Sequence, residues 1–297
     1  MATLLHADAF TTNNSLNAYG KCLLNQLKAV EMATADQPDP GLTVLIRTRN
    51  QAEGLSGIIT DIEQQYYQGN IQLIVVDTES SDRTVQIARA AGALVVPIDQ
   101  ASFNYAHSLN VGFERADHNQ VLCLVGHSSL TNTVTFKAAT RWHDSSTVGG
   151  AFGASLPPAA ATMGDRMIAG LQRSKRRLSA SEICTTWQPG MMVAHRSVFN
   201  KSVWQELNGF DEACGNGGED SDFARRMMQA GYAAAREPAL SVLHGYNLNI
   251  LQSIRQAHYL YRLRCGQQKA FDQSVLAFRP DLRHYQSEAS AGTLGHD

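Results

Sequence analysis

The chain has 297 residues, of which 43% are hydrophobic, so it can form one large domain or two small ones around a substantial core. Its formal net charge of −2 gives no indication of nucleic-acid binding. Five scattered cysteines without a CxxC pair argue against a disulfide framework or a structural zinc site and suit a reducing compartment.

The N-terminus lacks a basic region followed by an apolar run, and no apolar run approaches the roughly 20 residues of a membrane helix. We therefore expect a cytoplasmic protein without a transmembrane segment, for which peripheral membrane contact is left open. Leucines at helical spacing predict an amphipathic helix over 15–33, and two prolines within 36–41 indicate a linker.

From residue 41 onward, short apolar runs alternate with helical patterns. Predicted strands cover 42–46, 71–76, 93–98 and 121–125, and predicted helices cover 55–65, a segment around 85–88, and 103–116. This alternation predicts an α/β fold with a mainly parallel central sheet that helices flank on both faces. In such sheets ligands bind beyond the carboxyl ends of the strands, which places 47–50, 77–81 and 126–128 on one rim.

The alternation weakens after residue 148. The start of a strand is predicted at 187–194, a short helix at 197–207, a strand at 239–243 that delivers His244, and an amphipathic helix at 250–269. The basic cluster 173–177 is interpreted as a solvated charge run, with an anionic lipid or acceptor as the minority alternative. We expect an N-terminal helical extension (1–40), a main domain (41–247, divided into halves 41–130 and 131–247) and a C-terminal helix and tail (248–297).

The segment 215–223, Gly-Asn-Gly-Gly-Glu-Asp-Ser-Asp-Phe, is the most informative stretch of the chain. Three carboxylates, Glu219, Asp220 and Asp222, follow a glycine-rich turn and precede a helical pattern. A helix N-terminus favours ionised acids, so simple capping is one interpretation. Three acids exceed what capping needs, and an exposed carboxylate held there can act as a general base.

Four segments in this order resemble the inverting, nucleotide-sugar-dependent glycosyltransferases of family two, which have the GT-A fold. They are Val44-Leu-Ile-Arg-Thr-Arg-Asn50, Ile74-Val-Val-Asp-Thr-Glu-Ser-Ser-Asp-Arg-Thr84, Phe103-Asn-Tyr-Ala-His-Ser-Leu-Asn-Val-Gly112 and Gly218-Glu-Asp-Ser-Asp-Phe-Ala-Arg-Arg226. The resemblance covers roughly residues 42–245. It implies transfer of a sugar from a nucleotide-diphosphate sugar, UDP- or GDP-linked, to a glycan or small-molecule acceptor. It also implies that Asp220 deprotonates the acceptor hydroxyl, with Glu219 as the second candidate base.

The same resemblance implies a set of donor-binding residues. Asp77 would contact the nucleoside base, although it could instead cap the next helix, a role for which Asp82 is the better candidate. Around base and ribose the resemblance places Arg47, Thr48, Arg49, Asn50 and Glu79, with Gly126 on the same rim. Asn104, His107 and Asn110 share one helical face and either line the donor pocket or bind loop carbonyls. Trp187 and Trp204 are assigned to core packing in preference to stacking on an acceptor sugar.

One position departs from the family pattern. Where the family usually has Asp-x-Asp after the fourth strand, to carry a divalent metal, this chain has Val125-Gly126-His127. His244 falls where some members have a further metal ligand. We expect His127 and His244 to hold one divalent ion against the diphosphate, Mn²⁺ in preference to Mg²⁺, because imidazole suits the softer ion. The alternative is a metal-free site in which His127 and a lid arginine neutralise the diphosphate.

Two other functions fit parts of the pattern. Loss of Asp-x-Asp is compatible with a non-catalytic module that only binds a nucleotide-sugar, although such a module has no need for Glu219 and Asp220. A sugar-phosphate nucleotidyltransferase shares the sheet but wants a glycine-rich loop after the first strand, which Arg47-Thr-Arg-Asn50 lacks.

Overall fold

A computed structural model of the protein describes residues 38–172, 180–215, 217–245 and 248–278. The helix predicted over 15–33 and the basic cluster 173–177 lie outside these residues. Every strand predicted in the first half of the chain is confirmed, with slightly different ends. These strands lie parallel in the order β3-β2-β1-β4: β1 (Leu42–Thr48), β2 (Ile71–Thr78), β3 (Leu94–Ile98) and β4 (Gln120–Val125).

The second half of the chain extends this sheet. Beyond β4 the order continues β9-β6-β10-β8, with β9 and β8 antiparallel to their neighbours: β6 (Val148–Phe152), β8 (Glu182–Cys184), β9 (Ser197–Asn200) and β10 (Ala233–Arg236). Strands β6 and β10 were not predicted, because they consist mainly of glycine and alanine. These small residues have a packing reason, since a side chain at Gly149 would come within 2.7 Å of the Met227 sulfur.

Three other predictions need correction. The segment 197–207 is not all helix, because its first residues form β9 and only Lys201–Glu206 form α7. The expected strand at 239–243 is shorter, since a 3-10 turn, Pro238–Leu240, precedes β11 (Val242–Leu243). The segment 187–194, expected to start a strand, is a turn through Gly190, with φ +74°, that leads into the 3-10 turn Ala194–Arg196.

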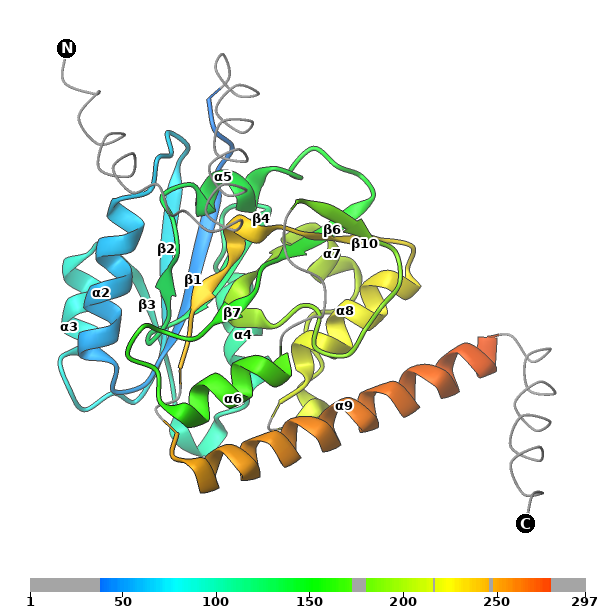
Figure 1. Ribbon diagram of the computed structural model, residues 1–297. Helices are drawn as coiled ribbons and strands as arrows, with labels where there is room; N and C mark the ends of the chain where they lie inside the picture. The colour runs from blue at the N-terminus through cyan, green and yellow to red at the C-terminus, as the bar shows by residue number, and fades with distance from the viewer. Residues whose placement is uncertain (1–37, 173–179, 216, 246–247, 279–297) are drawn as a thin grey trace, which may run out of the picture.

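Helices cover both faces of the large sheet (Figure 1). On one face α4, α7 and α8 pack on Leu45, Ile74 and Val76, and on the other α2, α3 and α5 pack on Val44, Ile46 and Val75. The helices are α2 (Ala52–Glu63), α3 (Thr84–Ala90), α4 (Tyr105–Glu114), α5 (Thr135–Thr140), α6 (Met163–Gln172), α8 (Glu219–Gln229) and α9 (Ile250–Phe278). The alternation of neighbouring strand residues between two cores confirms the expected three-layer α/β fold.

A small second sheet brings the end of β4 close to the segment before α9. Its order is β5-β11-β7, with β5 (Ser129–Leu130) and β7 (Ser155–Leu156) on either side of β11. The backbone N–H of His244, which follows β11, donates to the carbonyl of Leu156 at 2.9 Å. This sheet therefore fixes His244 near His127, which follows β4.

Candidate active site

The acidic segment is shaped by its glycines. Gly215, Gly217 and Gly218 have φ values of +66°, +131° and +97°, which other residues rarely adopt. Gly218 is the N-cap of α8, so the helix begins at Glu219 and its first turn carries all three acids. Their roles then diverge. Asp222 accepts from Arg225 at 2.6 Å and from Arg226 at 2.8 Å, so it stabilises the helix itself.

Glu219 points into the protein. It is only 3% exposed, and its Oε1 lies 3.7 Å from Nη1 of Arg47 at the end of β1. Burial and the nearby Asp220 raise the pKa of Glu219 to about 7, although Arg47 opposes the rise. Arg47 also donates to the carbonyl of Tyr105 at 3.2 Å and lies over the Tyr105 ring. The predicted donor-binding Arg47 is thus part of the acidic site.

Asp220 is partly exposed and faces the 3-10 turn before β9. Its Oδ2 accepts a hydrogen bond from the backbone N–H of Ala194 at 2.9 Å, which fixes the carboxylate. Desolvation raises the pKa of Asp220, while that hydrogen bond and the Ser221 N–H oppose the rise. A carboxylate that is fixed, reachable and more basic than usual has the properties of a general base.

The two predicted metal ligands come together, and a third histidine joins them. The Nε2 atoms of His127 and His244 are 3.0 Å apart. The ring of His195 stacks on that of His244, with centroids 4.2 Å apart and planes at 14°, and its Nε2 lies 2.8 Å from Oγ of Ser155. His195 was not predicted, because no motif or periodicity marks the turn that presents it.

These histidines have properties that suit a metal ion. Burial lowers the pKa values of His127 and His195, and burial together with His127 lowers that of His244 to about 3. All three are therefore neutral near pH 7, which is the form that binds metals. Two nitrogens about 2.1 Å from one ion, at right angles, would be separated by roughly 3 Å, close to the distance between His127 and His244. His127 and His244 therefore fit a divalent cation.

The acid and the histidines form one contiguous cluster. Ala194, whose N–H binds Asp220, directly precedes His195, and His195 stacks on His244 beside His127. The cluster thus joins the start of α8 to the carboxyl ends of β4 and β11. Asp220 and His127 were expected to share one site. In the structure they lie at the two ends of this cluster, connected through Ala194, His195 and His244.

The predicted nucleoside-binding rim is a set of interlocked turns after β1 and β2. Asp77 is 3% exposed and accepts from Thr48 Oγ1 at 2.9 Å and from the N–H of Ser80 at 2.9 Å. Asn50 accepts from the N–H of Ser81 at 2.8 Å. Asp82, the predicted helix cap, accepts from the N–H groups of Thr84 at 2.9 Å and Ala52 at 3.0 Å, so it serves the starts of two helices.

Other members of the rim lie beside these turns. Arg49 donates to the side chain of Gln100, whose backbone N–H donates to Glu79 at 3.2 Å. Asn50 and Glu79 have φ values of +50° and +47°, a strained conformation that concentrates at functional sites. A side chain at Gly126 would come within 2.9 Å of Thr48 and Gln51, so glycine lets the end of β4 approach these turns.

The polar face of α4 holds a loop. Asn104 caps α4 and donates to the carbonyl of Glu212 at 2.7 Å, and His107 Nδ1 lies 3.2 Å from the Glu212 carboxylate. Asn110 donates to the carbonyl of Phe210 at 2.9 Å and accepts from the Phe210 N–H at 2.9 Å and from Trp204 Nε1 at 3.1 Å. Of the two roles left open for these side chains, the structure displays the loop-binding one.

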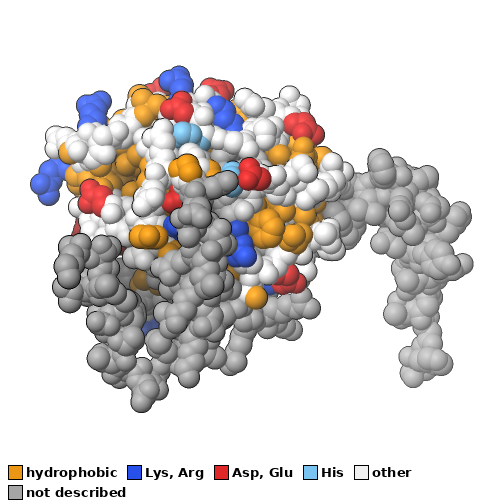
Figure 2. All heavy atoms as spheres, turned by 90° about the horizontal axis from the view of Figure 1, so that it is seen from above, with side chains coloured by type: hydrophobic (Ala, Val, Ile, Leu, Met, Phe, Trp, Pro, Cys, Tyr) orange, Lys and Arg blue, Asp and Glu red, His pale blue; other side chains and the backbone are white. Residues whose placement is uncertain are grey.

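The face of the molecule seen from above, opposite the side on which α9 lies in Figure 1, is electrostatically mixed. On the face seen from above in Figure 2, acidic and basic side chains of the described residues are interspersed, without one continuous basic area.

Trp187 is 5% exposed and Trp204 packs against the core, as expected. Among the described residues, no helix combines the length and apolar character that crossing a bilayer requires.

Comparisons with known proteins identify the family of the chain. The family model "Glycosyl transferase family 2" matches residues 43–206, and "N-terminal domain of galactosyltransferase" matches 192–248. The O-antigen chain rhamnosyltransferase RfbN of Salmonella typhimurium is 26% identical over 215 residues, which cover 69% of this chain and 67% of that protein.

Solved structures of glycosyltransferases share the fold. The mannosyltransferase PcManGT from Pyrobaculum calidifontis, in complex with GDP-Man and Mn²⁺, has a TM-score of 0.55 and 19% identity over 81% of this chain and 69% of that one. S. aureus TarS 1–349 in complex with UDP-GlcNAc has a TM-score of 0.53 and 13% identity over 76% of this chain and 66% of that one. The chain belongs to glycosyl transferase family 2 and is a glycosyltransferase with the GT-A fold.

Proposed function

We propose that this glycosyltransferase moves a sugar from a UDP- or GDP-sugar to an acceptor hydroxyl with inversion at the anomeric carbon, and that Asp220 is the catalytic base. The observation that carries the proposal is the contiguous cluster from Asp220 through Ala194 and His195 to His244 and His127. The cluster combines a carboxylate whose pKa is raised with two neutral imidazoles. These imidazoles suit a divalent cation that would neutralise the diphosphate leaving group.

We assign different roles to Asp220 and Glu219. Asp220 takes the proton of the acceptor hydroxyl, whose oxygen then attacks the anomeric carbon while the bond to the diphosphate oxygen breaks. Asp220 suits this role better than Glu219 because it is partly exposed and held by the Ala194 N–H. Glu219 is buried beside Arg47, so we assign it the positioning of Arg47 and of the helix start.

We assign the metal site to His127 and His244, with Mn²⁺ preferred over Mg²⁺ because both ligands are imidazoles. When bound, the ion would offset negative charge on the departing diphosphate. His195 keeps the His244 ring in place by stacking and is itself held by Ser155. Metal binding by this chain draws support from the 3.0 Å approach of the two Nε2 atoms and from the Mn²⁺ in the mannosyltransferase complex.

The donor would occupy the interlocked turns that carry Asp77, Asn50 and Glu79, in the half of the domain formed by 41–130. The acceptor would approach the half formed by 131–247, where Asp220 lies. Both nucleotide types stay open, since the structures named above contain GDP-Man in one case and UDP-GlcNAc in the other. A glycan acceptor is favoured by the similarity to a protein named as an O-antigen chain rhamnosyltransferase.

The test is release of nucleoside diphosphate from a panel of nucleotide-sugars in the presence of Mn²⁺. We expect one donor to be consumed, slowly without an acceptor and faster with one. D220N should lose acceptor-dependent release, whereas D222N should keep it, because Asp222 is already occupied by Arg225 and Arg226. Tight nucleotide binding without turnover of any donor would favour a binding module instead.

A further inference from the structure

The C-terminal helix α9 presents an unusual surface. It has 29 residues and runs along the lower side of the molecule in Figure 1, with α6 beside its first turns. Ile250, Ile254 and Tyr261 recur at spacings of four and seven, so they form one row along the helix, and they are 60%, 54% and 67% exposed. Exposed isoleucines aligned on one face of a helix, as Ile250 and Ile254 are, indicate a surface that binds another molecule.

A second row lies next to the first. Leu251, Arg255 and Arg262 have the same spacings, and all three are exposed, Leu251 at 71%. The helix thus carries an apolar row with a row of arginines at its edge. Helices that lie in the plane of a membrane interface place their apolar side among the lipids and their cations at the headgroups.

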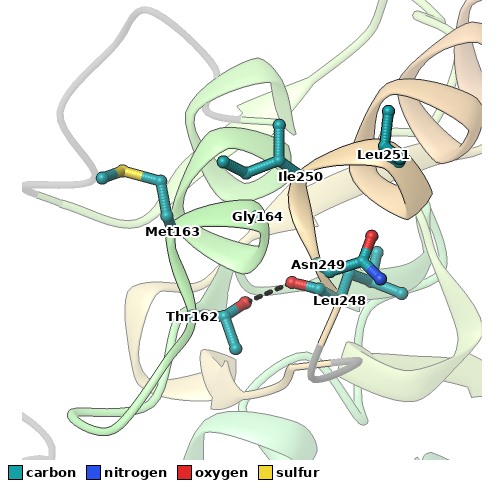
Figure 3. A pocket seen from close by; sticks show the side chains of 7 residues that line it. All are labelled: Thr162, Met163, Gly164, Leu248, Asn249, Ile250 and Leu251. Atoms are coloured by element: carbon teal, nitrogen blue, oxygen red, sulfur yellow. Dashed lines mark hydrogen bonds between the residues drawn. The ribbon is translucent and has the colours of Figure 1, made fainter.

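The start of α6 continues this apolar surface. Met163 and Met167, one turn apart, are 74% and 38% exposed, and Arg166 between them is exposed as well. Figure 3 shows the groove between the two helix starts, which Met163, Ile250 and Leu251 help to line. The surface extends over two helices, so it is broader than a single helical stripe.

The two helix starts are held in fixed relation. Thr162 Oγ1 donates to the carbonyl of Leu248 at 2.7 Å (Figure 3). A side chain at Gly164 would come within 2.0 Å of Ser253 Oγ, so glycine allows the helices to meet closely. The apolar surface is therefore preorganised and needs no refolding to meet a flat partner.

Charge decides which partner fits. Residues 248–278 contain four Lys and Arg residues and one acid, Asp272, although the whole chain has a net charge of −2. The one acid of α6, Asp165, is buried. A second copy docking face to face would bring the arginine rows together, whereas anionic headgroups complement them. We propose that α9 and the start of α6 form a docking surface for an anionic lipid membrane.

Helix α9 also contacts the acidic turn, through its opposite side. Tyr259 lies about half a turn around α9 from Ile250, and a side chain at Gly217 would come within 2.8 Å of the Tyr259 hydroxyl. The docking surface itself follows from α9 and α6 alone and does not depend on the proposed transfer reaction.

The experiment is co-sedimentation of the full chain with vesicles of phosphatidylcholine containing about one third phosphatidylglycerol, and with pure phosphatidylcholine vesicles. We expect binding to the anionic vesicles that weakens as salt is added, and little binding to the neutral ones. R255Q/R262Q should weaken binding about tenfold or more. L251S/I254S should weaken it comparably, because both rows contribute.

Matched controls use exposed residues on other faces. R89Q/R115Q removes two exposed arginines, and L94S removes an exposed apolar residue of β3. Both should bind vesicles as the wild type does. All variants should transfer sugar to a soluble acceptor, with release of nucleoside diphosphate, at the wild-type rate. Absence of binding to anionic vesicles, or binding that the α9 variants leave unchanged, would overturn the proposal. A dimer in sedimentation velocity that only L251S/I254S dissociates would assign the surface to a second copy.

Discussion

The substitution Glu219→Gln tests whether burial raises the pKa of this carboxyl in the folded protein. The rise of its pKa from an ordinary 4.5 to about 7 corresponds to about 3 kcal/mol. Between these two pH values the folded state keeps a proton that the unfolded state has released, so raising the pH favours unfolding. This destabilisation of the folded state is absent below pH 4.5 and complete above pH 7. Gln cannot ionise, so E219Q should gain up to about 3 kcal/mol over the wild type between pH 4.5 and 8.

The assay is urea unfolding of both proteins at several pH values, with the free energies compared at equal m-value. E63Q, which alters an exposed carboxylate at the end of α2, is the control and should follow the wild-type profile. A stability difference between E219Q and the wild type that is the same at pH 5 and pH 8 would refute the raised pKa of the Glu219 carboxyl.

The remaining predictions concern chemistry and the α4 loop. D220N should lower the rate of transfer by at least about a hundredfold while nucleotide-sugar affinity by calorimetry stays within about twofold, and a fully active variant would remove the base assignment. H127A should weaken Mn²⁺-dependent binding of nucleoside diphosphate by about tenfold or more, whereas an unchanged metal response would favour the metal-free site. N110A should lower the free energy of unfolding in urea by about 2 kcal/mol, because it leaves the Phe210 backbone groups and Trp204 without their partner. Donor affinity should stay unchanged. A large loss of donor affinity would instead assign Asn110 to the donor pocket.

The strands in the first half of the chain could be predicted from the sequence because they are continuous apolar runs. Val44, Ile46 and Val75 face one core and Leu45 and Ile74 the other, so both faces need hydrophobic residues and the pattern is strong. The second half was not readable by the same rule. In β6, Gly149 and Gly150 replace the expected branched residues, because Met227 and Met192 lie too close for a side chain.

The site was predictable where local sequence dictates local geometry. Glycines with positive φ before Glu219 force a helix to begin there, and the strand ends at Asp77 and His127 follow from the strands themselves. His195 could not be predicted, since its contact with His244 depends on how the turn after Val193 meets the small sheet. The loop-holding role of Asn110 likewise depends on tertiary contacts that spacing alone cannot reveal.

The stereochemistry of the product tests the central claim most directly. With whichever nucleotide-sugar the enzyme consumes, proton NMR of the fresh product reports the configuration at the transferred anomeric carbon. A single displacement assisted by Asp220 predicts the configuration opposite to that of the donor. Retention of the donor configuration would contradict Asp220 as the base of a one-step inverting transfer.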